Sequence, residues 1–304
     1  MTETVSNDLI SNIIQPYYDK IDQKYSTKDI WGYSTKFYDY DSITNGLHHS
    51  ELTIIAARHS MGKSAFALNL ATSLADQEIP VLYISYDLSK EAIAERLLSS
   101  IAEVDSNKIK SGNYSHTIFD KILPALGYID KKINAFLHII PNCYLNYKDL
   151  FEVIRKFKED FNNGVIIVDY FQLIKLYRPE DTRIIELSSL AAEFKHLAME
   201  IELPIILLSQ VSKRCEDRVN KNPILSDLAE CDALAQHSDN IIFIYREDYY
   251  KNLDDEEDYI INNKTKGEAI FTVAKQKNGP TGQFKLLFQA EINKFKNPLR
   301  SECF

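Results

Sequence analysis

The chain has 304 residues, of which 45% are hydrophobic and 26% are charged, which is too apolar for a disordered protein and enough for one large domain or two small ones. Its formal net charge of -9 argues against a protein that coats nucleic acid by long-range attraction, although a local basic surface is still allowed. It contains no run of about 18 apolar residues and no signal-peptide pattern at its start, so we expect a cytoplasmic protein without a membrane partner. The four cysteines form no C-x-x-C pair, so we expect reduced thiols and no zinc site.

Residues 1–28 carry apolar side chains at the three- and four-residue spacing of an amphipathic helix. The apolar stripe consists of Leu9, Ile10, Ile13, Ile14, Tyr17, Ile21 and Tyr25. Residues 29–50 are rich in Ser, Thr, Asp and Gly, which is typical of a linker. Because a tethered amphipathic helix must cover its stripe, we expect it either to bind a partner surface or to fold back on its own domain.

Residues 51–304 alternate short β-branched runs with helical patterns. The predicted strands are LTIIAA, VLYIS, GVIIVDYFQLI, PIILLSQ, NIIFIY, EAIFTVAK and FKLLF. KSAFALNLATSLADQ, LSSLAAEFKHLAMEI and residues 89–104 are predicted helices. A strand such as GVIIVDYFQLI, apolar at nearly every position, is expected where helices cover both faces of a parallel sheet. The alternation therefore predicts an α/β fold with a doubly wound, mostly parallel, twisted sheet flanked by helices.

Directly after LTIIAA lies a stretch in the register of the phosphate-loop pattern G-x-x-x-x-G-K-[ST]. Its eight positions are Ala57, Arg58, His59, Ser60, Met61, Gly62, Lys63 and Ser64, so only the first glycine is missing. Gly62 allows backbone N–H groups to approach phosphates, Lys63 supplies a positive charge to the terminal phosphates, and the Ser64 hydroxyl can ligate magnesium. The stretch therefore predicts nucleotide binding.

Two acidic residues at the ends of predicted strands fit the same chemistry. Asp169 ends VIIVD, where a phosphate-loop protein needs a second carboxylate for its magnesium ion. Taken alone, Asp169 would be an ordinary strand-terminal aspartate, and it is the phosphate loop that favours the metal role. Asp87 follows VLYISY and is the candidate for orienting or deprotonating a water molecule.

Together these stretches resemble the C-terminal motor domain of DnaB-type replicative helicases, which has a RecA-like P-loop NTPase core. Five blocks carry the resemblance, in the family's order, across about residues 30–290. They are ARHSMGKSAFALNLA for the Ala-first phosphate loop, RLLSSIAEVDSNKIKSGN after the second strand, VIIVDYFQLI for the Walker B strand, ELPIILLSQVSKRCEDRVNKNPILSDL for the sensor strand and its loop, and AKQKNGPTG for the C-terminal hairpin.

The resemblance implies a homo-oligomeric ring, usually of six subunits, with ATP and Mg²⁺ at each subunit interface and single-stranded DNA in the channel. By matching position, the phosphate loop and Asp169 hold the nucleotide, with Ser64 and Asp169 serving the metal. Gln210 would sense the terminal phosphate, and Lys275 and Lys277 would reach into the neighbour's site. The family's linker helix docks on the neighbouring subunit, which would give the N-terminal stripe its partner.

The sequence departs from the family at two catalytic positions. Asp87 replaces a glutamate and is one methylene shorter, which could shift the carboxylate by roughly an angstrom and lower the rate on the order of a hundredfold. Lys277 replaces the trans-acting arginine finger, and it keeps the charge but loses the planar fork.

The candidate DNA-contacting loops depart further. Ala-Glu-Cys-Asp at 229–232 replaces the family's Arg-Glu-Ser-Gly, so a cation and a flexible glycine give way to Ala229 and Asp232. Glu230 keeps the family's residue and stays a candidate position for DNA binding. In the preceding loop, the cations Lys213, Arg214 and Arg218 are the candidate DNA contacts.

The resulting prediction is an ATP-dependent DNA helicase of the 5′-to-3′ replicative type, which couples ATP hydrolysis to translocation on single-stranded DNA. One alternative is a catalytically weakened ATP-binding paralogue that acts as an assembly or accessory subunit. Another is a different RecA-type ATPase, such as a recombination or circadian-clock-like ring ATPase. Too few residues precede the linker for the family's N-terminal helical domain, which leaves ring closure and primase binding open; a helicase loader is a further candidate partner.

Overall fold

The computed structural model describes residues 10–27, 30–112, 115–175, 182–228, 232–254 and 267–299. Its strands are β1 (Leu52–Ala57), β2 (Val81–Ser85), β3 (Leu137–Ile140), β4 (Val165–Asp169), β5 (Ile205–Gln210), β6 (Asn240–Tyr245), β7 (Glu268–Gln276), β8 (Gly282–Gln289) and β9 (Lys294–Lys296). They form one sheet in the order β3-β2-β4-β5-β1-β6-β7-β8-β9. The strands from β3 to β6 pair in parallel, and β7, β8 and β9 extend the sheet antiparallel. The predicted α/β class with a mostly parallel sheet is confirmed.

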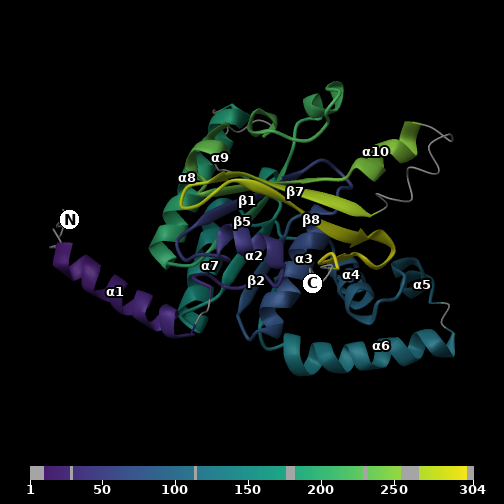
Figure 1. Cartoon of the computed structure of the whole chain (residues 1–304). Coiled ribbons are helices and arrows are strands. Elements are labelled where there is room, and N and C mark those ends of the chain that lie inside the picture. The colour runs from purple at the N-terminus through teal and green to yellow at the C-terminus, as the bar shows by residue number, and fades with distance from the viewer. Residues whose placement is uncertain are drawn as a thin grey trace, which may run out of the picture.

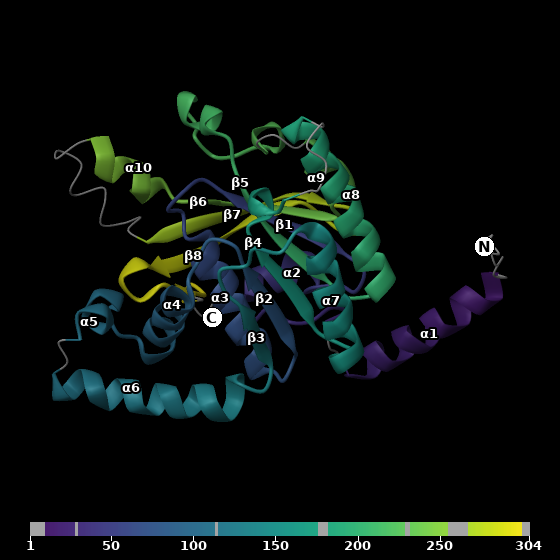
Figure 2. The ribbon, with the colours of Figure 1, turned by 180° about the vertical axis from the view of Figure 1, so that it is seen from behind.

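Helices cover both faces of this sheet, as Figures 1 and 2 show from opposite sides. The helices are α1 (Ile10–Thr27), α2 (Tyr38–Thr44), α3 (Lys63–Asp76), α4 (Lys90–Ala102), α5 (Ser106–Ser111), α6 (His116–Tyr128), α7 (Tyr147–Phe161), α8 (Arg183–Ile201), α9 (Asp232–His237) and α10 (Glu247–Asp254). Short turns of helix are η1 (Ile129–Ile133), η2 (Phe171–Leu173), η3 (Lys213–Asp217), η4 (Leu225–Asp227) and η5 (Ala290–Ile292). Ile54 and Ile55 are neighbours on β1, yet one packs in the core with α7 and α8 and the other in the core with α3. Burial on both faces explains why these strands are apolar at successive positions.

Local signals set the boundaries of several helices. Ser89 caps α4, because its side chain accepts a hydrogen bond from the backbone N–H of Ala92 at 3.2 Å. The predicted stripe of α8 is buried, from Leu187 to Ile201. The sequence did not reveal β3, α6 or α7, although Asn146 caps α7 in the same manner as Ser89 caps α4.

The segment predicted to be a linker is packed against the domain over most of its length. It contains α2, and Phe37, Tyr40 and Leu47 are all at most 6% exposed. The buried carboxylate of Asp41 accepts hydrogen bonds from the backbone N–H of Thr35, which fixes the turn before α2. The polar residues that suggested a linker are interleaved with these anchoring aromatic and aliphatic side chains, so composition alone was misleading.

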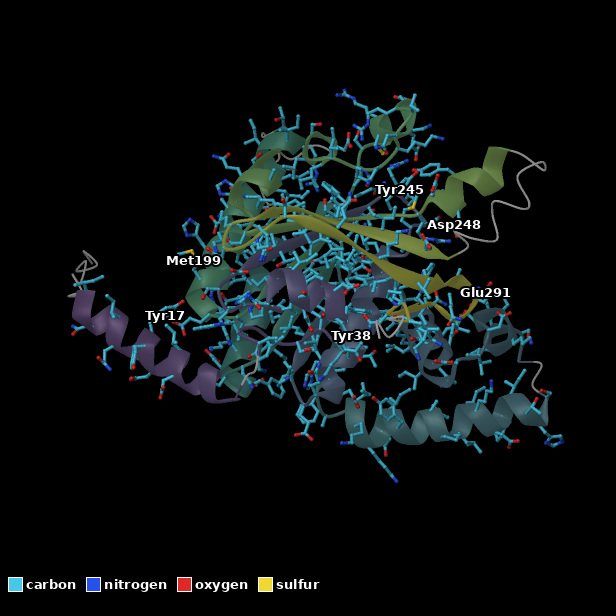
Figure 3. All side chains as sticks on the ribbon, viewed as in Figure 1. Tyr17, Tyr38, Met199, Tyr245, Asp248 and Glu291 are labelled. Carbon is cyan, nitrogen blue, oxygen red and sulfur yellow. The ribbon has the colours of Figure 1, made fainter. Side chains whose placement is uncertain are left out.

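Helix α1 is the predicted amphipathic helix, and it projects away from the sheet (Figures 1 and 3). The exposed fractions of Ile10, Ile14 and Tyr17 are 69%, 57% and 57%. Tyr17 stacks on Trp31 with ring centroids 5.7 Å apart, and this contact links α1 to the start of the domain. The structure therefore favours an exposed apolar face over a helix folded back on its own sheet. Within the described ranges, no helix has both the length and the apolar character needed to cross a membrane.

Candidate nucleotide-binding site

The carboxyl ends of the parallel strands meet at one edge of the sheet, where they surround a cavity of about 550 Å³. The strand register places Ala57 opposite Gln210 and Ser85 opposite Asp169 at this edge. The cavity is lined by Arg58, His59, Ser60, Gly62, Lys63, Ser64, Ala65, Asp87, Arg96, Asp169, Tyr170, Gln210, Arg246, Phe288, Ala290 and Asn293. Most of the predicted nucleotide-binding residues therefore lie in one place, although they come from several strands and loops.

The phosphate loop connects β1 to α3 in the predicted way. Gly62 is the residue before α3 and has φ 93°, a left-handed conformation that favours glycine. A side chain there would also meet the ring of Phe295, because a Cβ would lie 2.9 Å from its Cζ. The N-terminus of α3 thus opens onto the cavity with its backbone N–H groups and its dipole, an arrangement suited to phosphate.

Two of the eight loop residues turn away from the cavity. Ala57 is fully buried at the end of β1, and Met61 is 1% exposed in the core beneath α3. Their side chains therefore pack in the core and support the phosphate loop, and they do not face a ligand in the cavity. The remaining six residues of the loop line the cavity.

Lys63 is a partly buried cation of the cavity. Its ammonium donates to the carbonyl of Ser209 at 3.2 Å and lies 4.8 Å from the centre of the Tyr170 ring. Burial lowers the pKa of Lys63 to about 8, and the nearby carboxylates of Asp169 and Asp87 oppose that shift. Lys63 thus presents a positive charge at the cavity, and an anionic ligand there would further offset the cost of its burial.

Asp169 lies at the base of the cavity and is completely buried. Its Oδ2 accepts a hydrogen bond from the Tyr83 hydroxyl at 2.8 Å, while its Oδ1 is buried without a hydrogen-bond donor among the described residues. Burial raises the pKa of Asp169, and Ser64, Lys63 and Tyr83 counteract that effect. An oxygen left free beside a hydroxyl is a suitable donor set for Mg²⁺, which commonly takes one or two protein ligands and completes its shell with phosphates and water. The described residues contain no cluster of three His, Cys, Asp or Glu that could hold a metal by themselves.

Two further predicted residues, Asp87 and Gln210, line the same cavity. Asp87 lies just beyond β2, exposed at the cavity, and its carboxylate raises the pKa of Lys63. Gln210 ends β5, where its backbone N–H donates to Gln172 Oε1 at 3.2 Å and its side-chain amide contacts the His59 ring. Both side chains can therefore reach a ligand held over Lys63.

Among the cavity-lining residues that sequence reasoning missed are Arg246, Arg96 and Phe288. Arg246, directly after β6, donates to Asp248 at 3.1 Å, and its guanidinium lies 4.7 Å from the centre of the Phe288 ring. Arg96 reaches the cavity from α4. Like Asp87, Arg246 is a charged residue that follows an apolar parallel strand, and side chains at that position lie at the ligand-binding end of the sheet. The sequence therefore contained a signal that could have identified Arg246 as a site residue. Phe288 lies on the antiparallel β8, where nothing in the sequence indicates a site.

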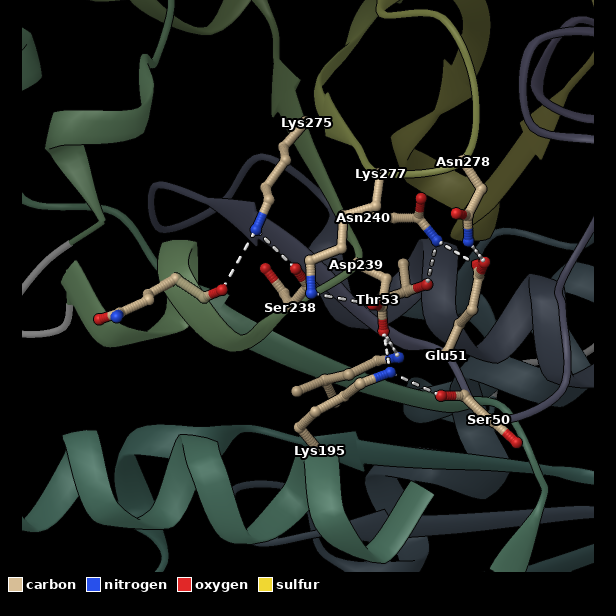
Figure 4. Close-up of polar contacts among 12 residues, drawn as sticks. Ser50, Glu51, Thr53, Lys195, Ser238, Asp239, Asn240, Lys275, Lys277 and Asn278 are labelled. Atoms are coloured by element: carbon tan, nitrogen blue, oxygen red, sulfur yellow. Dashed lines mark hydrogen bonds and ion pairs between the residues drawn. The ribbon is translucent and has the colours of Figure 1, made fainter. Parts of the chain in front are cut away.

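Lys275 and Lys277 are not among the residues that line the cavity, and Figure 4 shows their contacts. The ammonium of Lys275 donates to the carbonyl of Ser238 at 2.6 Å, and that of Lys277 donates to Asp239 Oδ1 at 3.1 Å. Asp239 also accepts from Lys195 at 2.7 Å and from the backbone N–H of Leu52 at 2.8 Å. The hairpin that carries Lys277 is thus fastened to the starts of β1 and β6.

This position separates the two lysines from the cavity of their own chain. Lys275 pairs with Ile241 near the start of β6, whereas the phosphate loop follows the end of β1. Because β1 and β6 run in parallel, the two lysines and the phosphate loop are separated by the length of these strands, about 15 Å. Lys275 and Lys277 do not join Lys63 within one chain.

The predicted DNA contacts follow β5. Lys213 and Arg214 are exposed on η3. Arg218 instead makes a two-pronged contact with Asp227, at 2.8 and 2.5 Å, and closes its loop, so its geometry gives it a structural role. Glu230 falls in 229–231, outside the described residues.

Comparisons with known proteins agree with this arrangement. The family model described as "DnaB-like helicase C terminal domain" matches residues 32–297. The replicative DNA helicase DnaC of Bacillus subtilis is 34% identical over 291 residues, which cover 95% of this chain and 62% of that protein. The chain thus spans about three fifths of the curated relatives' length.

Two solved structures share the fold. One, described as an "ATPase Domain", matches with a TM-score of 0.87 at 28% identity, covering 97% of this chain and 100% of that one. A structure of a DnaB-like replicative helicase "and its interactions with primase" matches with a TM-score of 0.83 at 28% identity. The match covers 98% of this chain and 69% of that one. The RecA-like core predicted from the sequence is confirmed, and the chain belongs to the DnaB-like helicase C-terminal domain family.

Proposed function

We propose that this chain is the ATP-hydrolysing motor of a replicative DNA helicase, acting as a ring that moves 5′ to 3′ on single-stranded DNA. The observation that carries the proposal is the division of the predicted catalytic residues between two opposite edges of the sheet. Lys63 and Asp169 line one cavity, whereas Lys275 and Lys277 lie at the other edge. A second copy placed head to tail would bring the two sets together.

ATP would be held by the phosphate loop, with its terminal phosphates at Lys63 and the N-terminus of α3. Ser64 and Asp169 would hold Mg²⁺, since Asp169 offers a buried oxygen without a donor. The metal would supply charge neutralisation at the phosphate oxygens. The Arg246 guanidinium, which lies over the Phe288 ring, adds a further cation at the same cavity.

Hydrolysis needs a residue that orients the attacking water and cations that stabilise the charge spread over the transferred phosphate. Asp87 is the proposed water-orienting carboxylate, because it lies at the cavity within the field of Lys63. Gln210 would contact the terminal phosphate from β5. Lys277 of the neighbouring subunit would supply the remaining charge.

The apolar face of α1 supports the ring. Ile10, Ile14 and Ile21 are at least 40% exposed on a helix that leaves its own domain, which suits docking on the next subunit. Six subunits and a closed ring follow the family pattern, as does single-stranded DNA in the channel. Lys213 and Arg214 are the proposed DNA contacts, and a few such residues per subunit suffice despite the net charge of -9.

Membership of the DnaB-like family removes the recombination and circadian-clock-like ATPases from consideration. The weakened paralogue is not favoured, because the relatives are replicative DNA helicases and Asp87 and Lys63 share one cavity. A helicase loader, primase binding, the cytoplasmic location and the domain boundaries stay predictions.

Nucleotide affinity is expected to depend on the charge of Lys63. A bound polyphosphate favours the ammonium form, so above the pKa of about 8 binding must take up a proton. The affinity should be flat below that pH and fall above it, approaching about tenfold per pH unit. Titration with a fluorescent ATP analogue at each pH would measure this affinity. Lys63→Arg is the control: its side chain stays charged across this range, so its affinity should not change with pH. A constant wild-type affinity across this range would contradict the assignment of Lys63.

The direction of movement is tested with partial duplexes. A duplex with a 5′ single-stranded tail should be unwound when ATP and Mg²⁺ are present, and one with only a 3′ tail should not. A gel assay of strand displacement gives the measurement, and Asp169→Asn serves as the inactive control. Unwinding from the 3′ tail alone would overturn the proposed polarity.

A further inference from the structure

An ion pair joins the phosphate loop to the candidate DNA loop. Arg58 Nε donates to Glu216 Oε1 at 2.8 Å, with 13% and 25% of the two side chains exposed. Arg58 Nη1 also donates to the carbonyl of Val211 at 2.9 Å, just beyond β5. The guanidinium holds both the start of the loop and η3, the turn that carries Lys213 and Arg214. The pair keeps Glu216 ionised, because Arg58 lowers the pKa of its carboxyl group.

Arg58 belongs to the nucleotide cavity at the same time. It lines the cavity together with its loop neighbours and Lys63. A triphosphate entering there brings several negative charges close to the guanidinium, and these compete with the single charge of Glu216. Arg58 is therefore placed to exchange one anionic partner for another when the nucleotide binds.

The loop after β5 is held together by contacts between its own residues. Arg218 closes it through the two-pronged contact with Asp227, and the backbone N–H of Ser212 donates to the Asp227 carbonyl at 2.8 Å. Val211 and Leu228 form a bridge at its base. These contacts connect η3, which carries Glu216, to the rest of the loop.

We propose that the Arg58–Glu216 ion pair couples nucleotide occupancy to the position of Lys213 and Arg214, so that Glu216 is a positioning residue for DNA binding. Without nucleotide, the pair holds η3 against the phosphate loop. With nucleotide, Arg58 turns to the phosphates and η3 is released towards DNA. The inference rests on the proposed function, since it assigns the route by which the two ligands of that motor influence each other.

The test measures the affinity for fluorescent oligo-dT with and without a non-hydrolysable ATP analogue and Mg²⁺. In the wild-type protein, nucleotide should tighten DNA binding by about tenfold, within the usual range of allosteric coupling. In Glu216→Gln, nucleotide should tighten DNA binding by only about twofold or less. Because such coupling is reciprocal, oligo-dT should alter the affinity for the nucleotide by the same factor in each protein.

The matched control is Asp217→Asn, which removes the same charge from the same turn at an exposed position, and it should keep the wild-type factor. Thermal melting shows whether each variant is folded, and Glu216→Asp serves as a second variant that retains the charge but shortens the reach to Arg58. If folded Glu216→Gln couples as strongly as the wild type, the inference is overturned and the proposed function stands. If the wild type does not bind oligo-dT, the proposed function fails and the inference fails with it.

Discussion

Replacing Lys63 with alanine is expected to lower the rate of ATP hydrolysis by at least about a hundredfold, the scale of losing one preorganised electrostatic donor. Lys63 is the first residue of α3, and its ammonium donates to the carbonyl of Ser209 and is stabilised electrostatically by Asp169 and Asp87. Alanine removes the charge and leaves Asp169 in a buried site with one cation fewer. Steady-state release of phosphate, measured at saturating ATP, gives the loss in turnover.

Lys285→Ala is the control for this variant. Lys285 lies on β8 and pairs with Glu268 at 2.9 Å, with 59% of its side chain exposed. Its loss should change hydrolysis little, because an exposed ion pair contributes about 1 kcal/mol or less to stability. Hydrolysis by Lys63→Ala within a few-fold of the wild type would mean that the cavity at α3 is not the hydrolytic site.

Replacing Lys277 with alanine is expected to lower hydrolysis by about a hundredfold or more while leaving the affinity for ATP nearly unchanged. Lys277 lies at the sheet edge opposite to its own cavity. In the proposed ring, its loss would remove positive charge from the neighbour's site and no contact with the nucleotide in its own site. The fold should survive, because Asp239 keeps its bonds to Lys195 and to the backbone of Leu52. Parallel measurements of turnover and of nucleotide affinity separate the two effects.

Mixing the two inactive variants makes this prediction sharper. When Lys63→Ala and Lys277→Ala subunits assemble together, about a quarter of the interfaces combine an intact cavity with an intact lysine. Activity should therefore reappear on mixing, although neither variant has it alone. Lys195→Ala is the matched control, because it removes the other cation on Asp239 and should leave turnover largely intact. Mixtures that stay as inactive as their components would contradict a site shared between subunits.

Strands buried on both faces were the most predictable part of the fold. VIIVD and LTIIAA are apolar at successive positions because α7 and α8 cover one face and α3 the other, and few other environments demand that pattern. The edge strand β3 is only partly buried, with His138 in its middle, and gave no comparable signal. Helix α2 could not be predicted, because the buried side chains that anchor this segment, such as Tyr40 and Leu47, are separated by polar residues in the sequence.

The candidate site likewise has a part that could be predicted from the sequence and a part that could not. Lys63, Ser64 and Asp169 could be predicted because each must occupy a fixed place relative to one strand and one helix. Contacts between distant segments could not be predicted, since nothing in the local pattern joins Arg58 to Glu216 or Lys277 to Asp239. The unshared carboxylate oxygen of Asp169 likewise depends on the packing of Tyr83 against it.

The central claim is that ATP turnover in the cavity at Lys63 drives movement on DNA, and steady-state hydrolysis with and without oligo-dT tests it most directly. The account predicts turnover that rises on adding oligo-dT and that disappears in Lys63→Ala. Turnover that does not respond to DNA at any salt concentration, or protein that binds ATP without hydrolysing it, would contradict the account.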